Sequence, residues 1–306
     1  MRQVLREPTG ISPRVDCVFR ALLADPDHTD RLIAFLNAVL QRPAPLVEVE
    51  LRNPVQPSEF IEDGHIVVDV LARDASGETF QVEMQSWNQA ALKERMLYGW
   101  AALYRAQSER GRSYTLLRPV VSIWILDQNT LRNASRFHHR FTLRDPRADV
   151  ELTNHLELHV IELARWREHP DPATPPDLVG WMRFFAEAET WPNVPAEIDT
   201  PALESAMSVL TEFQLNTARN DLYRSRLDAL SVQATIEAAM ADAVAGREQE
   251  RAAKEQALAA KEQERAAKEQ ALADKERALA KEAQALAREA RLRERLRAAG
   301  IDPDGN

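Results

Sequence analysis

The sequence feature that most constrains the fold is the long stretch from about Ala202 to Ala299, which contains no proline. Almost every residue in it is a good helix former, so the stretch predicts a long helix. At roughly 1.5 Å per residue, its repetitive part alone would extend on the order of 75 Å. A globular domain is therefore expected in the residues that precede it.

A repeat within this stretch predicts either of two structures. The segment that begins at Arg251 recurs at Arg265, a spacing of two heptads, and four leucines share one heptad position: Leu258, Leu272, Leu279 and Leu286. The positions three residues before and after these leucines are mostly Glu and Lys, whereas a strong coiled coil has two apolar positions per heptad. The stretch is thus a weak, alanine-assisted coiled coil or a solitary helix held by charge pairs four residues apart. In the first case, residues 201–299 would form a homo-oligomer.

The first half of the chain has the mixed pattern of an α/β domain. Apolar residues recur at helical spacing after Ser12-Pro13 and again from Leu32 to Leu40. The remaining segments are predicted as strands at 66–72, 79–85 and 120–126, a helix at 89–110, and weaker strands near 137–143 and 156–163. We expect this domain to occupy residues 1–165.

Proline marks the expected domain boundaries. Residues 166–200 read as a proline-rich connector that contains a short amphipathic helix with Trp181 and Phe185 in its apolar face. The helical tail then occupies residues 201–299, and residues 300–306 are expected to be a disordered C-terminus.

Composition excludes several classes of protein. No apolar run approaches the ~20 residues that span a bilayer, and the N-terminus lacks the apolar region of a secretory signal. One cysteine, Cys17, excludes an internal disulfide and is ordinary for the cytoplasmic location that we expect. The net charge of −9 argues against a broad basic surface that coats nucleic acid. Any contact with nucleic acid should be local and assisted by a metal ion.

The predicted hairpin carries the candidate chemistry. A three-residue loop that ends in a left-handed Gly77 would place Asp69 directly opposite Glu83. Gln85 would project on the same face as Glu83, because side chains alternate along a strand. Two carboxylates that face each other repel, and a divalent cation such as Mg²⁺, which prefers oxygen ligands, would compensate them. A solvated polar strand face is the alternative interpretation of these residues.

Four sequence segments occur in a characteristic order: Ser12-Pro-Arg-Val-Asp-Cys-Val-Phe-Arg, Leu32-Ile-Ala-Phe-Leu-Asn-Ala-Val-Leu, Val67-Val-Asp-Val-Leu-Ala and Gln81-Val-Glu-Met-Gln. Together they resemble the PD-(D/E)xK nuclease family transposases, also called recombination-promoting nucleases. The match continues through Gly111-Arg-Ser-Tyr114 into Pro119-Val-Val-Ser-Ile, and covers about residues 12–126. The resemblance implies a restriction-endonuclease-like α/β fold, with a mixed central sheet flanked by helices.

The resemblance also assigns roles to residues. It implies that Asp69, Glu83 and Gln85 are catalytic, with Asp69 and Glu83 as metal ligands and Gln85 in the place of the superfamily's lysine. An amide positions water but lacks the charge of lysine, although the family commonly carries Glu-x-Gln. Asp16, on the first predicted helix, is either a further metal ligand or a helix-terminal charge.

Weaker candidates complete the set. Arg95 and Tyr98 lie one helical turn apart and either bind phosphate or pair and pack locally. His138 and His139 have no metal-ligand partner at recognisable spacing and are predicted to be plain strand residues.

The predicted function is that of a cytoplasmic, Mg²⁺-dependent endodeoxyribonuclease, with Mn²⁺ as an alternative ion, that acts on DNA in recombination or mobile elements. One alternative is an inactive nuclease-fold protein that acts through its C-terminal helix. The other is a nuclease that acts on RNA, because the metal chemistry on phosphate would be the same.

Overall fold

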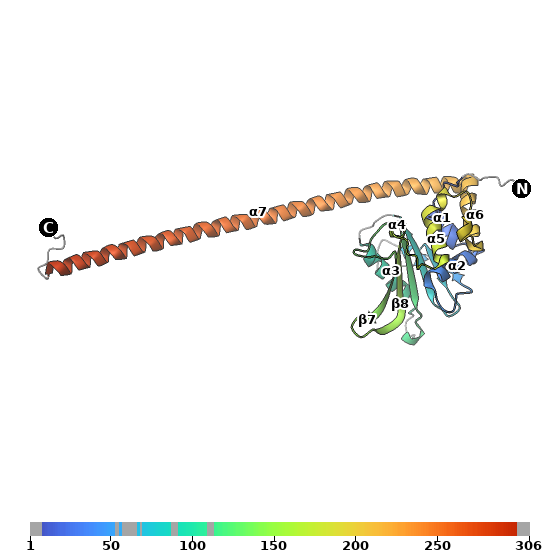
Figure 1. Ribbon diagram of the computed structural model, residues 1–306, viewed down its shortest axis with the longest axis horizontal. Helices are drawn as coiled ribbons and strands as arrows, with labels where there is room; N and C mark the ends of the chain where they lie inside the picture. The colour runs from blue at the N-terminus through green and yellow to red at the C-terminus, as the bar shows by residue number, and fades with distance from the viewer. Residues whose placement is uncertain are drawn as a thin grey trace. The chain divides into compact units, whose positions relative to one another are not determined.

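The computed structural model describes residues 8–52, 55–56, 66–67, 69–86, 91–108 and 113–298. By their contacts they fall into two compact units, Met1–Thr235 and Ile236–Asn306. No helix in these ranges is both long and apolar enough to cross a membrane. Figure 1 labels the main helices and strands.

A mixed six-stranded sheet forms the centre of the first unit, as expected for a restriction-endonuclease-like α/β fold. In spatial order its strands are β1 (Glu50–Leu51), β4 (Val70–Arg73), β5 (Thr79–Gln85), β6 (Val120–Leu126), β8 (Val150–Glu162) and β7 (His138–Asp145). The pairs β5–β6 and β6–β8 are parallel, and the other pairs are antiparallel. The predicted strand at 120–126 is confirmed by β6, and every residue of β6 is buried, as is typical of a strand covered on both faces.

The hairpin of β4 and β5 has the expected register. Val70 pairs with Val82 and Arg73 with Thr79, and Gly77 ends the loop with a φ of 88°. The predicted strand 66–72 is, however, interrupted: Ile66–Val67 is a separate strand, β3, that pairs with β2 (Val55–Gln56). At the interruption the Asp69 carboxylate accepts the backbone N–H of Met84 at 3.1 Å. This bond satisfies the N–H of Met84 beside the end of β4.

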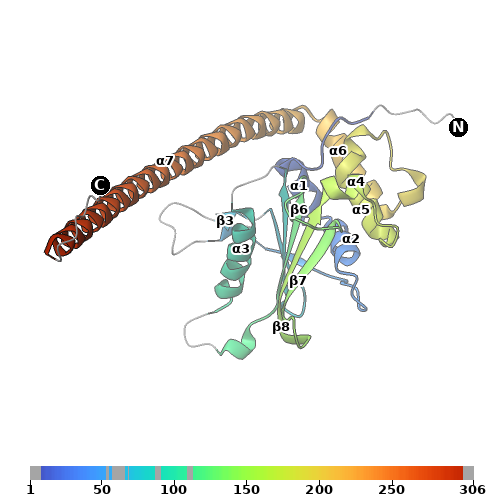
Figure 2. The same cartoon turned by 60° about the vertical axis from the view of Figure 1, so that its left-hand side comes forward.

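Helices cover both faces of the sheet (Figure 2). On one face lie α1 (Asp16–Leu23), α2 (Thr29–Leu40) and α5 (Pro176–Glu187), together with apolar residues of β5 and β6 such as Val82 and Ile123. On the other face lies α3 (Leu92–Ala106), which packs on Trp124 and Leu126 of β6. The remaining short helices are α4 (Leu163–Glu168), η1 (Tyr114–Leu116), η2 (Ala188–Thr190) and η3 (Ala196–Ile198).

The core continues past residue 165, where the sequence predicts the domain to end. The ring of Trp181 lies 5.5 Å from that of Phe35 in an edge-on contact, and Phe185 lies 5.7 Å from the same ring. These aromatic contacts join α5 to α2. Residues of the expected connector thus share one hydrophobic core with the N-terminal helices.

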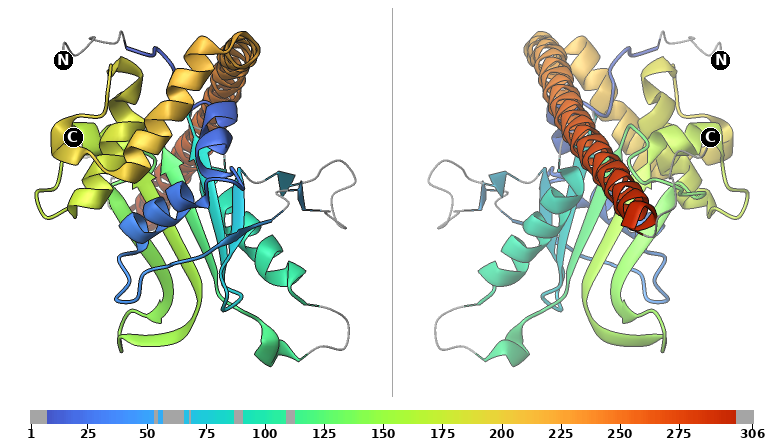
Figure 3. Two further views of the ribbon diagram at one scale, coloured as in Figure 1. Left: turned by 90° about the vertical axis from the view of Figure 1, so that its right-hand side faces the viewer. Right: turned by 90° about the vertical axis from the view of Figure 1, so that its left-hand side faces the viewer.

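The expected long C-terminal helix is confirmed, but it begins at Thr217 and not near Ala202, because two helices meet at Asn216. The first, α6 (Pro201–Leu215), packs with α1 and α2 (Figure 3). The second, α7 (Thr217–Ala298), begins where the Asn216 side chain accepts the backbone N–H of Arg219 at 3.1 Å. This bond satisfies a free donor in the first turn and makes Asn216 an N-cap.

The two ends of α7 differ in burial. Tyr223 is buried in the first unit, where its hydroxyl accepts the backbone N–H of Ser12 at 3.1 Å. In the second unit, the heptad leucines are exposed, for example Leu258 at 63%. The expected C-terminal segment 300–306 lies outside the described residues.

Candidate active site

Asp69 and Glu83 stand at opposing positions of the hairpin. Asp69 precedes Val70, and Val70 pairs with Val82, so continuing the register by one residue brings Asp69 opposite Glu83. Both side chains are largely buried: that of Asp69 is 12% exposed, and Glu83 as a residue is 9% exposed. The sequence interpretation of a solvated polar strand face therefore does not describe them.

Burial and mutual repulsion act on both carboxyl groups. Burial, and then the charge of Asp69, raises the pKa of Glu83 from 4.5 to about 8. Burial also raises the pKa of Asp69, although the N–H of Met84 and the Arg20 guanidinium oppose this rise. The pair is thus poorly compensated in its doubly ionised form, and a cation would stabilise it.

Arg20 is a site residue that sequence reasoning missed. Its Nη2 and Nε atoms lie 3.2 and 3.3 Å from Oδ1 of Asp69. The residue lies on α1, one turn after Asp16, and an Asp and an Arg four residues apart on a helix share one face. That spacing places Arg20 beside Asp16, but it does not indicate the contact with Asp69.

Asp16 lies near the pair but has partners of its own. Its Oδ1 accepts the backbone N–H of Cys17 at 2.7 Å, and its Oδ2 lies 3.6 Å from Nε of Arg226. Its charge contributes to the raised pKa of Asp69. Across the described ranges, no three His, Cys, Asp or Glu side chains are grouped to hold a metal ion. The metal-binding role of Asp16 stays a prediction.

A chain of buried hydrogen bonds ends at Glu83. The indole N–H of Trp124 donates to Oγ of Ser122 at 2.9 Å, Ser122 donates to Oε1 of Gln81 at 3.0 Å, and Nε2 of Gln81 donates to Oε1 of Glu83 at 3.0 Å. These residues alternate along β5 and β6 on the face that α3 covers. Sequence reasoning gave them no role, although the same alternation selects Gln81 along with Glu83 and Gln85.

The remaining predicted residues lie around this pair. Gln85 is 8% exposed and ends β5 on the face of Glu83. The Arg95 guanidinium lies 6.0 Å from the centre of the Trp124 ring, and its charge lowers the pKa of Glu83 against the larger effect of burial. Tyr98 is 51% exposed on α3.

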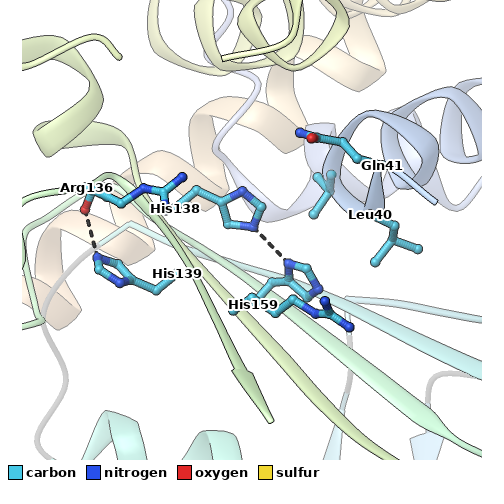
Figure 4. Close-up of a pocket in the computed structure, with 8 residues that line it drawn as sticks. Leu40, Gln41, Arg136, His138, His139 and His159 are labelled. Atoms are coloured by element: carbon cyan, nitrogen blue, oxygen red, sulfur yellow. Dashed lines mark hydrogen bonds between the residues drawn. The ribbon is translucent and has the colours of Figure 1, made fainter. Parts of the chain in front are cut away.

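A separate hollow lies on the opposite face of the sheet, beside the end of α2 (Figure 4). There Nε2 of His138 and Nδ1 of His159 are 2.8 Å apart, and Nε2 of His159 lies 2.8 Å from Oε1 of Glu157. His159 pairs in register with Ile123, whose side chain belongs to the core on the α2 side. The predicted location of His138 and His139 in a strand is confirmed by β7, and this hollow is no part of the carboxylate site.

Comparison with known proteins identifies a family. The family model described as PD-(D/E)XK nuclease family transposase matches residues 13–239. This range includes Asp69, Glu83, α5, α6 and the first turns of α7. Nucleases of the PD-(D/E)XK type generally use divalent metal ions. Neither a curated protein nor a solved structure matches the chain.

Proposed function

Because this chain belongs to the PD-(D/E)XK nuclease family transposases, we propose that it is a metal-dependent DNA endonuclease with Asp69, Glu83 and Gln85 as its catalytic set. The family itself indicates a nuclease-like function associated with recombination. The observation that carries the finer proposal is the buried pair of carboxylates, Asp69 just before β4 and Glu83 on β5, with the polar side chain of Gln85 on the same face as Glu83. The single cysteine, Cys17, is consistent with the cytoplasmic location that we propose.

The donor set suits a hard divalent cation. Carboxylate oxygens are the ligands that Mg²⁺ prefers, and it is commonly bound by one or two carboxylates together with water and phosphate oxygens. Asp69 and Glu83 would hold Mg²⁺, or Mn²⁺ in its place, and Asp16 is the proposed further contributor. Such an ion polarises the phosphoryl group and lowers the pKa of bound water.

The protein's own residues supply orientation and charge. Gln85 orients the attacking water through its amide, in the position where the superfamily has lysine. Two residues near the pair could supply the positive charge that the superfamily's lysine would carry. They are Arg20, which contacts Asp69, and Arg95, whose charge acts on Glu83. Either guanidinium would stabilise the charge that develops on the phosphoryl oxygens.

We expect the DNA-binding interface to be small. The net charge of −9 disfavours a broad electrostatic interface, so binding should depend on a few side chains near the site. Arg95 and Tyr98 are both exposed on α3, and we propose them as contacts to the DNA backbone.

Cleavage of supercoiled plasmid by the full chain tests this proposal. We expect nicking that requires Mg²⁺ or Mn²⁺. Asp69→Asn and Glu83→Gln should each reduce the nicking rate by at least about a hundredfold, because each replaces a charged metal ligand with a neutral amide of nearly the same shape. Glu94→Gln is the matched control, since Glu94 is an exposed carboxylate in the first turn of α3. It should cleave like the wild type.

Two results would redirect the assignment. A folded wild type that cleaves single-stranded RNA but no DNA would favour the RNA-directed alternative. Absence of cleavage of both substrates with either metal ion would favour the inactive interaction protein that acts through its C-terminal helix.

A further inference from the structure

The hydrogen-bond chain from Trp124 to Glu83 is buried and is formed by three neutral side chains and one carboxyl group. Ser122 is fully buried, Gln81 is 1% exposed and Trp124 is 3% exposed. Each of the three bonds measures 2.9 or 3.0 Å. The residues come from the two central parallel strands β5 and β6, where Gln81 pairs with Ser122 and Glu83 with Trp124.

The direction of the chain follows from its first member. An indole N–H can only donate, so the Ser122 oxygen accepts from Trp124 and its own hydrogen is free to point at Gln81. The Gln81 oxygen is then the acceptor, and its NH₂ group must face Glu83. The orientation of this amide is therefore fixed by chemistry, and a reversed amide would place two oxygens against each other.

The two carboxylates of the site are held by different means. A charged guanidinium, that of Arg20, contacts Asp69, whereas a neutral amide contacts Glu83. A second cation at Glu83 would cancel the remaining negative charge of the pair and compete with a metal ion. The neutral chain restrains the Glu83 carboxyl group without adding a positive charge beside it.

From this arrangement we infer that Gln81, Ser122 and Trp124 are positioning residues that orient Glu83 as a metal ligand. The inference rests on the nuclease function proposed above. Partners of this kind, which hold a ligand without touching the metal, typically change metal affinity by about 10 to 100-fold when they are removed.

Calorimetric titration of the full-length chain with Mn²⁺ and Mg²⁺ tests the inference. Ser122→Ala interrupts the chain at its middle, and Trp124→Phe removes the donor that sets its direction. We expect each to weaken metal binding by about 10 to 100-fold. In nicking assays both variants should need correspondingly more metal ion, and the rate at saturating metal should stay near that of the wild type.

Trp100→Phe is the matched control. The indole of Trp100 also donates a 3.0 Å hydrogen bond, to the carbonyl of Val120, but takes no part in the chain. Metal affinity should be unchanged in this variant. The melting temperature of every variant in EDTA separates a general loss of stability from a loss of metal affinity. Gln81→Asn, which keeps the amide but shortens its reach, serves as a milder variant if Ser122→Ala does not fold.

The possible outcomes separate the two proposals. If the wild type binds metal and Glu83→Gln does not, the metal site stands. Unchanged affinity in Ser122→Ala and Trp124→Phe would then overturn the positioning role alone. If the folded wild type binds neither ion, the proposed function fails, and the inference fails with it.

Discussion

Among single residues, Glu83 has an environment that should make stability depend on pH. Its pKa rises from 4.5 to about 8 on folding, so between these values the folded protein retains a proton that the unfolded chain has lost. Stability from this group is therefore fully present below pH 4.5 and is lost as pH rises through 8. Without metal ions, the free energy of unfolding should fall by at most roughly 1.4 kcal/mol for each pH unit.

Urea unfolding in EDTA between pH 6.5 and 8 measures this effect. Glu83→Gln carries no ionisable group and should flatten the dependence, whereas Glu94→Gln should leave it unchanged. Addition of Mg²⁺ should stabilise the wild type more at pH 8 than at pH 6.5, because the ion binds the ionised pair. An equal slope in Glu83→Gln and wild type would contradict the assignment of the proton to Glu83.

His138 should make the free energy of unfolding decrease as the pH falls, the opposite of the dependence expected from Glu83. Burial, and then the neighbouring His159, lowers its pKa from 6.5 to about 3. The unfolded chain binds a proton on this group below pH 6.5 and the folded protein does not, so stability falls as pH falls from 6.5 towards 3. His138→Gln, which is neutral throughout, should lessen the acid loss by up to roughly 1.4 kcal/mol per pH unit. Denaturant unfolding of both proteins at pH 4, 5 and 6 would reveal the difference, and parallel curves would count against it.

At the scale of elements, the turn of the β4–β5 hairpin holds the carboxylate pair in register. Gly77 has a φ of 88°, and a Cβ placed there would lie 3.2 Å from Cγ of Arg118. Gly77→Ala should lower the free energy of unfolding by roughly 1–2 kcal/mol, because alanine is strained in the left-handed region. Gly77→Asn adds the same Cβ but tolerates this conformation better, so it should lose less. Thermal melting of the two variants would show the difference. Equal losses of stability would mean that the contact of the new Cβ with Arg118, and not backbone strain, destabilises both variants.

The hairpin also shows which parts of the site could be predicted from sequence. Strand alternation and one glycine suffice for its register, because both are local signals. The contact of Arg20 with Asp69 depends on the packing of α1 against the hairpin. The two residues are 49 positions apart in the sequence, and no local pattern reports their contact. The interruption of the strand at Asp69 was missed for a similar reason, because the Asp69 side chain is bonded to Met84 on the neighbouring strand and no local pattern reports that contact.

The helices after residue 165 were harder to assign. No proline separates α6 from the tail, so the two read as one helix, although Leu203, Leu210 and Phe213 are buried in the core. These three residues lie at helical spacing, and their periodicity was the available signal. The break at Asn216 could not be read from helix propensity, because it depends on one capping hydrogen bond.

At the scale of the whole molecule, the division after Thr235 predicts what can be removed. The first unit contains the sheet, the candidate site and the start of α7, which Tyr223 anchors in the core. A chain that ends at Thr235 should therefore fold and keep the metal-dependent rise in melting temperature. A chain that ends at Leu215 lacks Tyr223 and its bond to Ser12, and should melt at a lower temperature.

The same truncation tests whether the tail associates with a second copy of the chain. The heptad leucines from Leu258 to Leu286 are exposed, and ion pairs four residues apart, such as Arg251 with Glu255 at 3.2 Å, run along the helix. Exposed pairs of this kind contribute only about 0.3–0.5 kcal/mol each, so burial of the leucines against a second copy would stabilise the helix more.

We expect sedimentation of the full chain to show concentration-dependent association that the chain ending at Thr235 lacks. Leu272→Ala combined with Leu279→Ala should weaken the association, whereas the same change at exposed Leu97, on α3, should not. A full chain that stays monomeric at every concentration would leave the solitary helix as the correct description of the tail.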